Sequence, residues 1–190
     1  MINHEAQKVL GGDFIPPEDI MSSMGIVYTK EEIALFWETI PSKEILEWGR
    51  ANKYMLIAGP NKPMSLVDIY TMHKKRSFFR KEEKVEKRWY MIRKEVLSNS
   101  TCKNWSEQKA LISEENEVPN APQLAWAITM YKIIRGTCLF NGIYARTSSI
   151  SNSRENIVIG NSIAYGLIID SFEADFRYCN IGISVAQKII

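Results

Sequence analysis

A stretch that is apolar around most of a helical circumference lies between residues 123 and 135, and no other feature constrains the fold as strongly. A Pro-Asn-Ala-Pro segment precedes it, and Gly136 follows in the position favoured directly after a helix C-terminus. A helix with apolar residues on nearly every side needs neighbours on nearly every side. We therefore predict a buried central helix, Gln123 to Arg135, covered by the segments before and after it.

The first two thirds of the chain are expected to be rich in short helices. Thr29 and Glu32 have the spacing of a capping box, and apolar residues then recur at helical intervals up to Pro41. Ser42 can cap a second helix directly behind the first, and so short a connection predicts a helical hairpin. Further elements predicted for this part are helices at 2–10, 65–72 and 105–112 and strands at 54–58 and 89–94.

The sequence pattern changes after Thr137, where short runs of β-branched or aromatic residues alternate with polar turns. Consecutive strands usually pair, so the economical arrangement is a mainly antiparallel β-meander packed on the central helix. The predicted fold is α+β in one domain spanning residues 1–190, helix-rich over 1–136 and strand-rich over 137–190. The strands predicted for the second part are 143–147, 157–160, 163–169 and 181–186.

The chain has 190 residues and is 45% hydrophobic, which is enough to bury a core without disulfides or metal. It has neither a run of roughly 18 apolar residues nor a basic start followed by an apolar run. We therefore expect a cytoplasmic protein with no membrane partner. Its three cysteines, Cys102, Cys138 and Cys179, are odd in number and widely spaced, so we expect free, buried thiols and no disulfide framework.

Net charge is only +2, yet residues 73–88 hold eight Lys or Arg against three Glu. The cations could contact phosphates while Phe78, Phe79 or Trp89 stacks on bases, so one alternative is a nucleic-acid-associated protein that uses the segment 74–94. The interleaved glutamates favour the plainer interpretation of a solvated charged face, and an acidic protein partner is a third interpretation. The candidate nucleic-acid-binding residues are Lys74, Lys75, Arg76, Arg80 and Lys81.

Carboxylates gather directly after a predicted strand, at Asp170, Glu173 and Asp175. Such a group can bind a divalent cation or act as acid and base, so a metal-dependent hydrolase is a second alternative. The same residues are ordinary in turns, which is the interpretation we favour. With only His4 and His73 in the chain, a Ser-His-Asp triad or a His-rich zinc site is not expected.

A polar stretch around residues 146–153 is a candidate anion site, because a guanidinium and several hydroxyls occur close together in the sequence. A solvated hairpin loop explains the same composition, and we favour that interpretation. The candidate ligand-binding residues are Arg146, Ser148 and Arg177.

Five short stretches of the chain look familiar when taken together. They are Ile-Pro-Ser-Lys-Glu-Ile-Leu-Glu-Trp at 40–48, Ala-Gly-Pro at 58–60, Val-Pro-Asn-Ala at 118–121, Arg-Gly at 135–136 and Tyr-Ala-Arg-Thr-Ser at 144–148. With these stretches the chain resembles a group of uncharacterised bacterial proteins. The resemblance covers roughly residues 1–190 and implies one intact bacterial domain, without an activity, a ligand or a catalytic residue.

No constellation in the sequence has the residue types and spacing of a known reaction. The leading hypothesis is therefore a non-enzymatic binding or protein-interaction domain without cofactor or metal.

Overall fold

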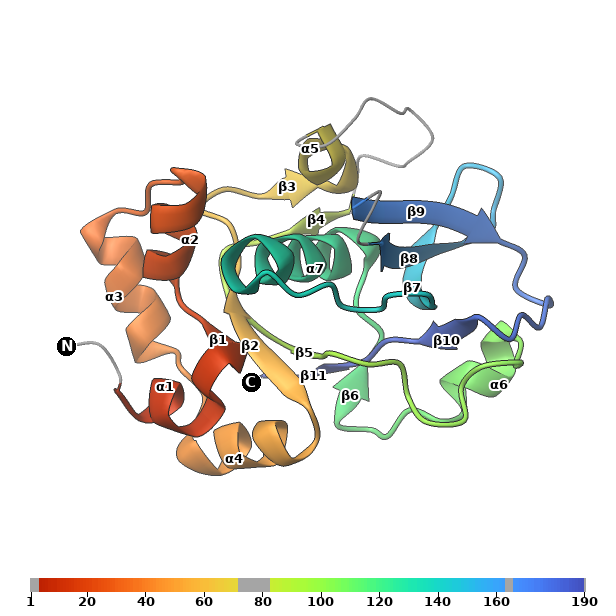
Figure 1. The fold of residues 1–190 in the computed structure, drawn as a ribbon, viewed down its shortest axis with the longest axis horizontal. Coiled ribbons are helices and arrows are strands. Elements are labelled where there is room, and N and C mark those ends of the chain that lie inside the picture. The colour runs from red at the N-terminus through yellow and green to blue at the C-terminus, as the bar shows by residue number, and fades with distance from the viewer. Residues whose placement is uncertain (1–3, 72–82, 163–165, 190) are drawn as a thin grey trace.

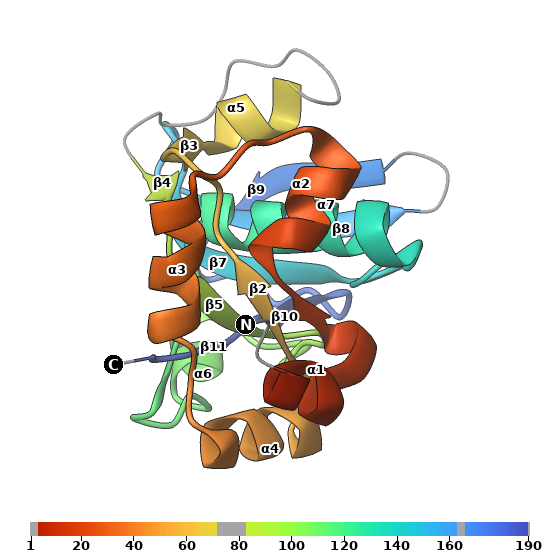
Figure 2. The same ribbon diagram turned by 90° about the vertical axis from the view of Figure 1, so that its left-hand side faces the viewer.

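The computed structural model describes residues 4–71, 83–162 and 166–189 and has an α+β fold (Figure 1). The first four helices gather on one side of the molecule, which faces the viewer in Figure 2. α7 lies in the middle, and the strands β7 to β10, between Tyr144 and Ile183, lie on the other side (Figure 1). The helices are α1 His4–Leu10, α2 Pro17–Met24, α3 Lys30–Glu38, α4 Lys43–Ala51, α5 Leu66–Thr71, α6 Trp105–Lys109 and α7 Ala121–Arg135.

Two helices begin where their capping residues predict. α3 follows the capping box of Thr29 and Glu32, in which each side chain accepts a hydrogen bond from the other residue's backbone. α7 begins with the same arrangement of Asn120 and Gln123 and ends at Gly136. The φ of 70° at Gly136 is a left-handed conformation that glycine adopts without strain. The predicted central helix is confirmed, with one extra half-turn at its N-terminus.

The short connection between α3 and α4 does not make a hairpin, so that prediction is wrong. α4 packs against α1 and β2 (Tyr54–Ala58) instead. Gly49 lets α4 approach the sheet closely, because a Cβ at this position would lie 3.0 Å from the terminal methyl carbon of Met91.

Five strands from distant parts of the chain form the first sheet, in the order β1, β2, β5, β11, β6. β1 is parallel to β2, and the other neighbours are antiparallel. The strong apolar runs of β2 and β5 are confirmed as strands, whereas the two-residue strands beside them are too short to leave a period in the sequence. The remaining bounds are β1 Phe14–Ile15, β5 Trp89–Arg93, β6 Asn116–Glu117 and β11 Ala186–Gln187.

The second sheet has the order β10, β7, β8, β9, and a pair of short strands, β3 (Met64–Ser65) and β4 (Lys84–Val85), forms a third. β7, β8 and β9 form the predicted antiparallel meander. β10 pairs parallel to β7, so the connection 173–180 has to return along the sheet from the β9 edge before β10 begins. The bounds are β7 Tyr144–Ile150, β8 Asn156–Ser162, β9 Gly166–Phe172 and β10 Ile181–Ile183.

α7 is buried between the two large sheets. Nε1 of its Trp126 donates a hydrogen bond to the carbonyl of Ala58 in β2, 2.9 Å away, while other residues of α7 pack against β7 and β8. One cluster of buried apolar side chains runs from Ala6 in α1 to Ala186 in β11. Within the three described ranges, no helix has the length and hydrophobicity needed to span a bilayer.

Candidate functional site

The two faces of the four-stranded sheet are covered by different parts of the chain. Ile157 and Ile159 of β8 point toward α7 and belong to the main core. Val158 points to the opposite face and is buried outside that core. The strand register places Arg146 beside Val158, and Ile183 beside Arg146, on this outer face. We call Arg146, Asn156, Val158, Ile181 and Ile183, all buried, the outer-face cluster.

Arg146 is the one charged residue among the fully buried side chains of the described part of the chain, with 0% of its surface exposed. Its Nη1 donates a hydrogen bond to Oε1 of Gln108 at 3.3 Å, and its Nη2 donates one to the carbonyl of Phe176 at 3.4 Å. Both distances exceed the roughly 2.9 Å typical of such bonds. The Nε of Arg146 has no hydrogen-bond partner. The guanidinium is therefore poorly satisfied.

No ion pair among the described residues includes Arg146. The strand register pairs Arg146 with Val158 and Val158 with Asp170, so these three residues share one face of the sheet. The Asp170 carboxylate is thus two strands away from Arg146, and Asp170 is exposed. Burial lowers the pKa of the Arg146 guanidinium below its ordinary value, because the charged form loses its hydration. A buried cation without a counter-ion destabilises the folded state.

Asn156 adds a second unsatisfied group to the same face. Its side chain is 1% exposed, and neither the amide oxygen nor the amide nitrogen has a hydrogen-bond partner. It lies two residues before Val158 on β8, so alternation along the strand directs it to the outer face. The outer-face cluster thus combines apolar side chains with two polar side chains, Arg146 and Asn156, that have buried atoms without a hydrogen-bond partner.

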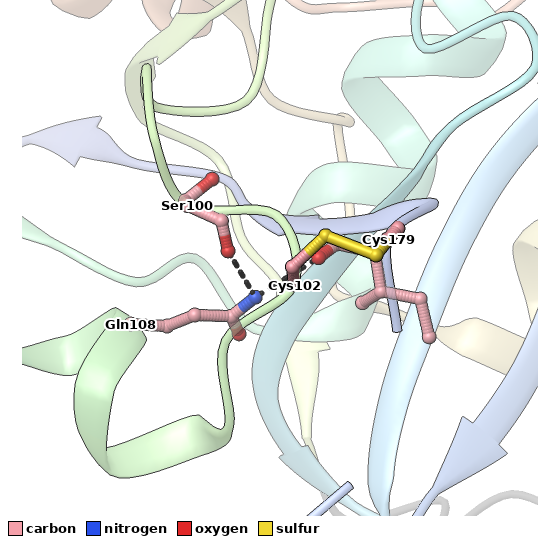
Figure 3. The surroundings of a disulfide bond; sticks show 5 residues. Ser100, Cys102, Gln108 and Cys179 are labelled. Atoms are coloured by element: carbon pink, nitrogen blue, oxygen red, sulfur yellow. Dashed lines mark hydrogen bonds between the residues drawn. A yellow bond between two sulfur atoms is a disulfide. The ribbon is translucent and has the colours of Figure 1, made fainter. Parts of the chain in front are cut away.

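The outer-face cluster is covered by the segment 102–109, which contains α6, and by the connection 173–180, and together we call these two segments the cover. Nε2 of Gln108 in α6 donates hydrogen bonds to the carbonyl of Ser100, 2.8 Å away, and to that of Ile181, 3.1 Å away (Figure 3). Gln108 is fully buried, and its Oε1 is the atom that accepts from Arg146. α6 is therefore held against the edge of the sheet by the same side chain that contacts the guanidinium.

Few contacts attach the connection 173–180 to α6 and the residues before it. The backbone N–H groups of Trp105 and Cys102 donate to the carbonyls of Ala174 and Tyr178, at 2.8 Å and 3.0 Å. Arg177 makes a two-point ion pair with Glu107, with N–O distances of 2.8 Å and 3.0 Å. This pair lowers the pKa of Glu107 to about 2, chiefly through the hydrogen bond from Arg177 and then through that from the Asn104 backbone.

A disulfide between Cys102 and Cys179 joins the two parts of the cover (Figure 3). The prediction of three free, buried thiols is wrong for this pair, and both cysteines are exposed. Cys138 is free and partly exposed. The two bonded cysteines are 77 residues apart in sequence, and only the return of the chain toward β10 brings them together. Spacing alone gives no sign of that contact.

The structure separates the three residues predicted to bind a ligand. Arg146 lies in strand β7, not in a solvated loop. Ser148 is exposed, and its backbone N–H donates to the carbonyl of Pro119. Arg177 is exposed and paired with Glu107. Arg146 and Arg177 nevertheless contact consecutive residues of α6. Arg146 contacts Gln108 beneath the cover, and Arg177 contacts Glu107 at its surface. Sequence reasoning missed Gln108 and Asn156, which look like ordinary polar surface residues in the sequence.

The candidate nucleic-acid-binding residues Lys74, Lys75, Arg76, Arg80 and Lys81 lie outside the described residues. At the described end of the basic segment, Lys87 pairs with Glu32 and the Arg88 guanidinium lies over the Tyr90 ring, 4.8 Å from its centre. Trp89 is buried against Phe36 and donates a hydrogen bond to the Phe36 carbonyl, 2.6 Å away. Trp89 is therefore not placed to stack on a base, and the other two residues predicted to stack, Phe78 and Phe79, lie outside the described residues.

The carboxylates of the alternative metal site are all exposed. Asp170 lies in β9, where its Oδ1 accepts a hydrogen bond from the Ser171 backbone, and Glu173 and Asp175 follow in the connection to β10. Across the described ranges, no three His, Cys, Asp or Glu side chains are grouped so that they could hold a metal ion. The described geometry gives the hydrolase hypothesis no support.

A groove of about 490 Å³ lies between the end of α3 and the start of β5. Its size suits a small molecule. Two of its polar side chains already have partners, since Lys87 is paired with Glu32 and the Thr39 hydroxyl donates to the Leu35 carbonyl. None of its lining side chains has a buried polar atom without a hydrogen bond. Among the described residues, Arg146 and Asn156 of the outer-face cluster contribute three of the eight buried side-chain polar atoms without a hydrogen-bond partner.

Comparison of the chain with protein-family models, with curated proteins and with solved structures gave no match. The functional argument therefore depends on the geometry of the chain itself.

Proposed function

We propose that this chain is a non-enzymatic binding domain for a small organic monocarboxylate, with Arg146 as the residue that binds the carboxylate. The observation that carries this proposal is the fully buried Arg146 guanidinium, which has no counter-ion among the residues that the structure describes. Without an anion, such a group destabilises the fold and leaves its Nε unbonded. A carboxylate would neutralise the charge and accept two parallel hydrogen bonds from the guanidinium.

The surroundings of Arg146 favour a monocarboxylate over phosphate. One guanidinium balances one negative charge, whereas a phosphate group carries close to two at neutral pH and would leave excess charge among Val158, Ile181 and Ile183. These apolar side chains suit the hydrocarbon part of an organic acid. The unpartnered amide of Asn156 supplies a further donor and acceptor on the same face.

Butyrate is a suitable probe, because it joins one carboxylate to a short apolar chain. Titration calorimetry and thermal unfolding are carried out on oxidised protein and on protein treated with a thiol reductant. We expect saturable binding of one butyrate per chain in at least one of the two states. Butyramide, which lacks the charge, and inorganic phosphate should bind at least roughly tenfold more weakly.

Two arginine variants give a matched comparison. Arg146→Met should abolish butyrate binding, whereas Arg177→Met removes an exposed guanidinium of the cover and should retain it. Arg146→Lys keeps the charge without the planar two-point donor and should bind with intermediate affinity. If wild-type protein and Arg146→Met respond alike to butyrate in both disulfide states, the proposed function is wrong.

A further inference from the structure

The Cys102–Cys179 disulfide lies at the surface, where another thiol can reach it. Both cysteines are exposed, and exposed disulfides are the ones that exchange readily with external thiols. Cys102 also has a φ of 57°, a left-handed conformation that is strained for a residue with a side chain. Breaking the bond frees this residue to relax.

This disulfide is the one covalent link between the two parts of the cover. Cys102 lies shortly before α6, and Cys179 lies shortly before β10. The other attachments to the segment before and in α6 are two backbone hydrogen bonds and the exposed Arg177–Glu107 pair, and exposed pairs contribute little stability. At its end the connection is also held by a backbone hydrogen bond from Tyr144 to the Asn180 carbonyl, 2.8 Å away, and by the contact of the Tyr178 ring with that of Phe172. Phe176, in the middle of the connection, is 49% exposed and so provides only a partial apolar anchor. Without the disulfide, only these non-covalent contacts hold the connection 173–180 over Arg146.

The connection also supplies one of the two acceptors that Arg146 has in the closed structure. Nη2 of Arg146 donates to the Phe176 carbonyl, and Nη1 donates to Gln108. When the connection moves away, Nη2 joins Nε as a free donor, and the two nitrogens are placed side by side for one carboxylate. Gln108 stays in place through its bonds to Ser100 and Ile181.

We propose that the Cys102–Cys179 disulfide controls access to Arg146, so that its reduction opens the connection 173–180 and admits the carboxylate. The reductant is a dithiol. Its first thiolate attacks one sulfur and forms a mixed disulfide while the other cysteine leaves as a thiolate, and its second thiolate then releases the protein. The disulfide gains two electrons and two protons and becomes two thiols, and the dithiol loses the same and becomes a cyclic disulfide.

This inference rests on the proposed function for the identity of the ligand, but opening of the cover has a readout of its own. A cytoplasmic location, which the sequence predicts, would suit the inference, because disulfides in cytoplasmic proteins are usually transient and redox-sensing. Hydrogen exchange of the Cys102 and Trp105 amides, which donate to the connection 173–180, measures the opening directly, and butyrate titration measures access to Arg146. Both are performed on the Cys138→Ser variant, which removes the free thiol and prevents disulfide exchange within the chain.

Reduction is expected to raise the exchange rate of the Cys102 and Trp105 amides, which donate to the connection, and to tighten butyrate binding by roughly tenfold or more. Cys102→Ser with Cys179→Ser should behave as the reduced protein without any reductant. Where this double variant fails to fold, the reduced Cys138→Ser protein carries the test alone. Arg146→Met should show the faster exchange without the binding.

The outcomes separate the two proposals. Butyrate binding that is equal in the oxidised and reduced proteins overturns control by the disulfide and leaves the proposed function standing. Faster exchange on reduction, with no butyrate binding in either state, overturns the proposed function and retains the opening of the cover. Unchanged exchange on reduction contradicts the opening itself, whatever the butyrate result.

Discussion

The inner and outer faces of the four-stranded sheet are both buried, but they are buried in different ways. The inner face presents Ile157 and Ile159 to α7, an apolar helix in the main core. The outer face carries Arg146 and Asn156 with unused polar groups beneath an exposed connection. Since one set of strands supplies both faces, the difference comes from what covers them. The inner face buries apolar side chains against a helix, whereas the outer face buries Arg146 and Asn156 with polar atoms that have no partner.

The largest expected effect lies on the inner face. Ile159→Ala leaves a cavity between β8 and α7, so the free energy of unfolding should fall by about 2–5 kcal/mol. Val158→Ala, the next residue on the opposite face, should be less destabilising because the exposed cover can collapse onto the space. Urea denaturation of both variants measures the contrast. An equal loss from the two variants would mean that the faces are packed alike.

The second-largest expected effect on the free energy of unfolding comes from removal of the disulfide. Cys102→Ser with Cys179→Ser should lower the free energy of unfolding by about 2–4 kcal/mol, because the bond joins residues 77 apart and restricts the unfolded chain. Cys138→Ser is the control, since this cysteine forms no disulfide. Denaturation under non-reducing conditions gives both values. A double variant as stable as Cys138→Ser would show that the bond does not hold the cover in solution.

Asn156→Leu should act in the opposite direction. The change replaces a buried amide without hydrogen-bond partners by an apolar group of similar size, and the free energy of unfolding should rise by about 1 kcal/mol. Thermal or chemical denaturation is sufficient to detect it. A loss of stability would reveal that the amide has partners in solution and that the outer face is better satisfied than described.

The smallest effect is a dependence on pH at the surface of the cover. Because the folded-state pKa of Glu107 is lowered from 4.5 to about 2, its contribution to stability is present above pH 4.5 and is lost as the pH falls toward 2. The difference in stability between wild type and Glu107→Gln should therefore shrink over that window, and salt should weaken it. A difference that stays constant from pH 6 to pH 2 would assign the effect of the substitution to something other than the carboxylate charge.

The helices and strands that have a signature within a short window of sequence could be predicted. Capping residues and apolar periods identified α3 and α7, and continuous apolar runs identified β2 and β5. The two-residue strands, the parallel pairing of β10 with β7 and the packing of α4 on α1 depend on contacts between distant segments. No single window of the sequence contains that information.

The candidate site shows the same division. The sequence pointed to Arg146 as a candidate ligand-binding residue because it lies in a polar stretch. Its burial, however, follows from the return of residues 173–180 over the sheet. Cys102 and Cys179 meet for the same reason. The apolar residues beside Arg146 are Val158 and Ile183 of neighbouring strands, so its burial could have been indicated only by the strand register and by knowing that both faces of the sheet are covered.

The central claim is that Arg146 is kept for binding at the expense of stability, and the unfolding free energy of Arg146→Met in the absence of any ligand tests it most directly. Methionine retains much of the length of arginine and removes the buried charge. Allowing for the weak donor that Gln108 loses, we predict that Arg146→Met is more stable than wild type by about 1 kcal/mol or more in chemical denaturation. A variant clearly less stable than wild type would contradict this account and make Arg146 a structural residue of the cover.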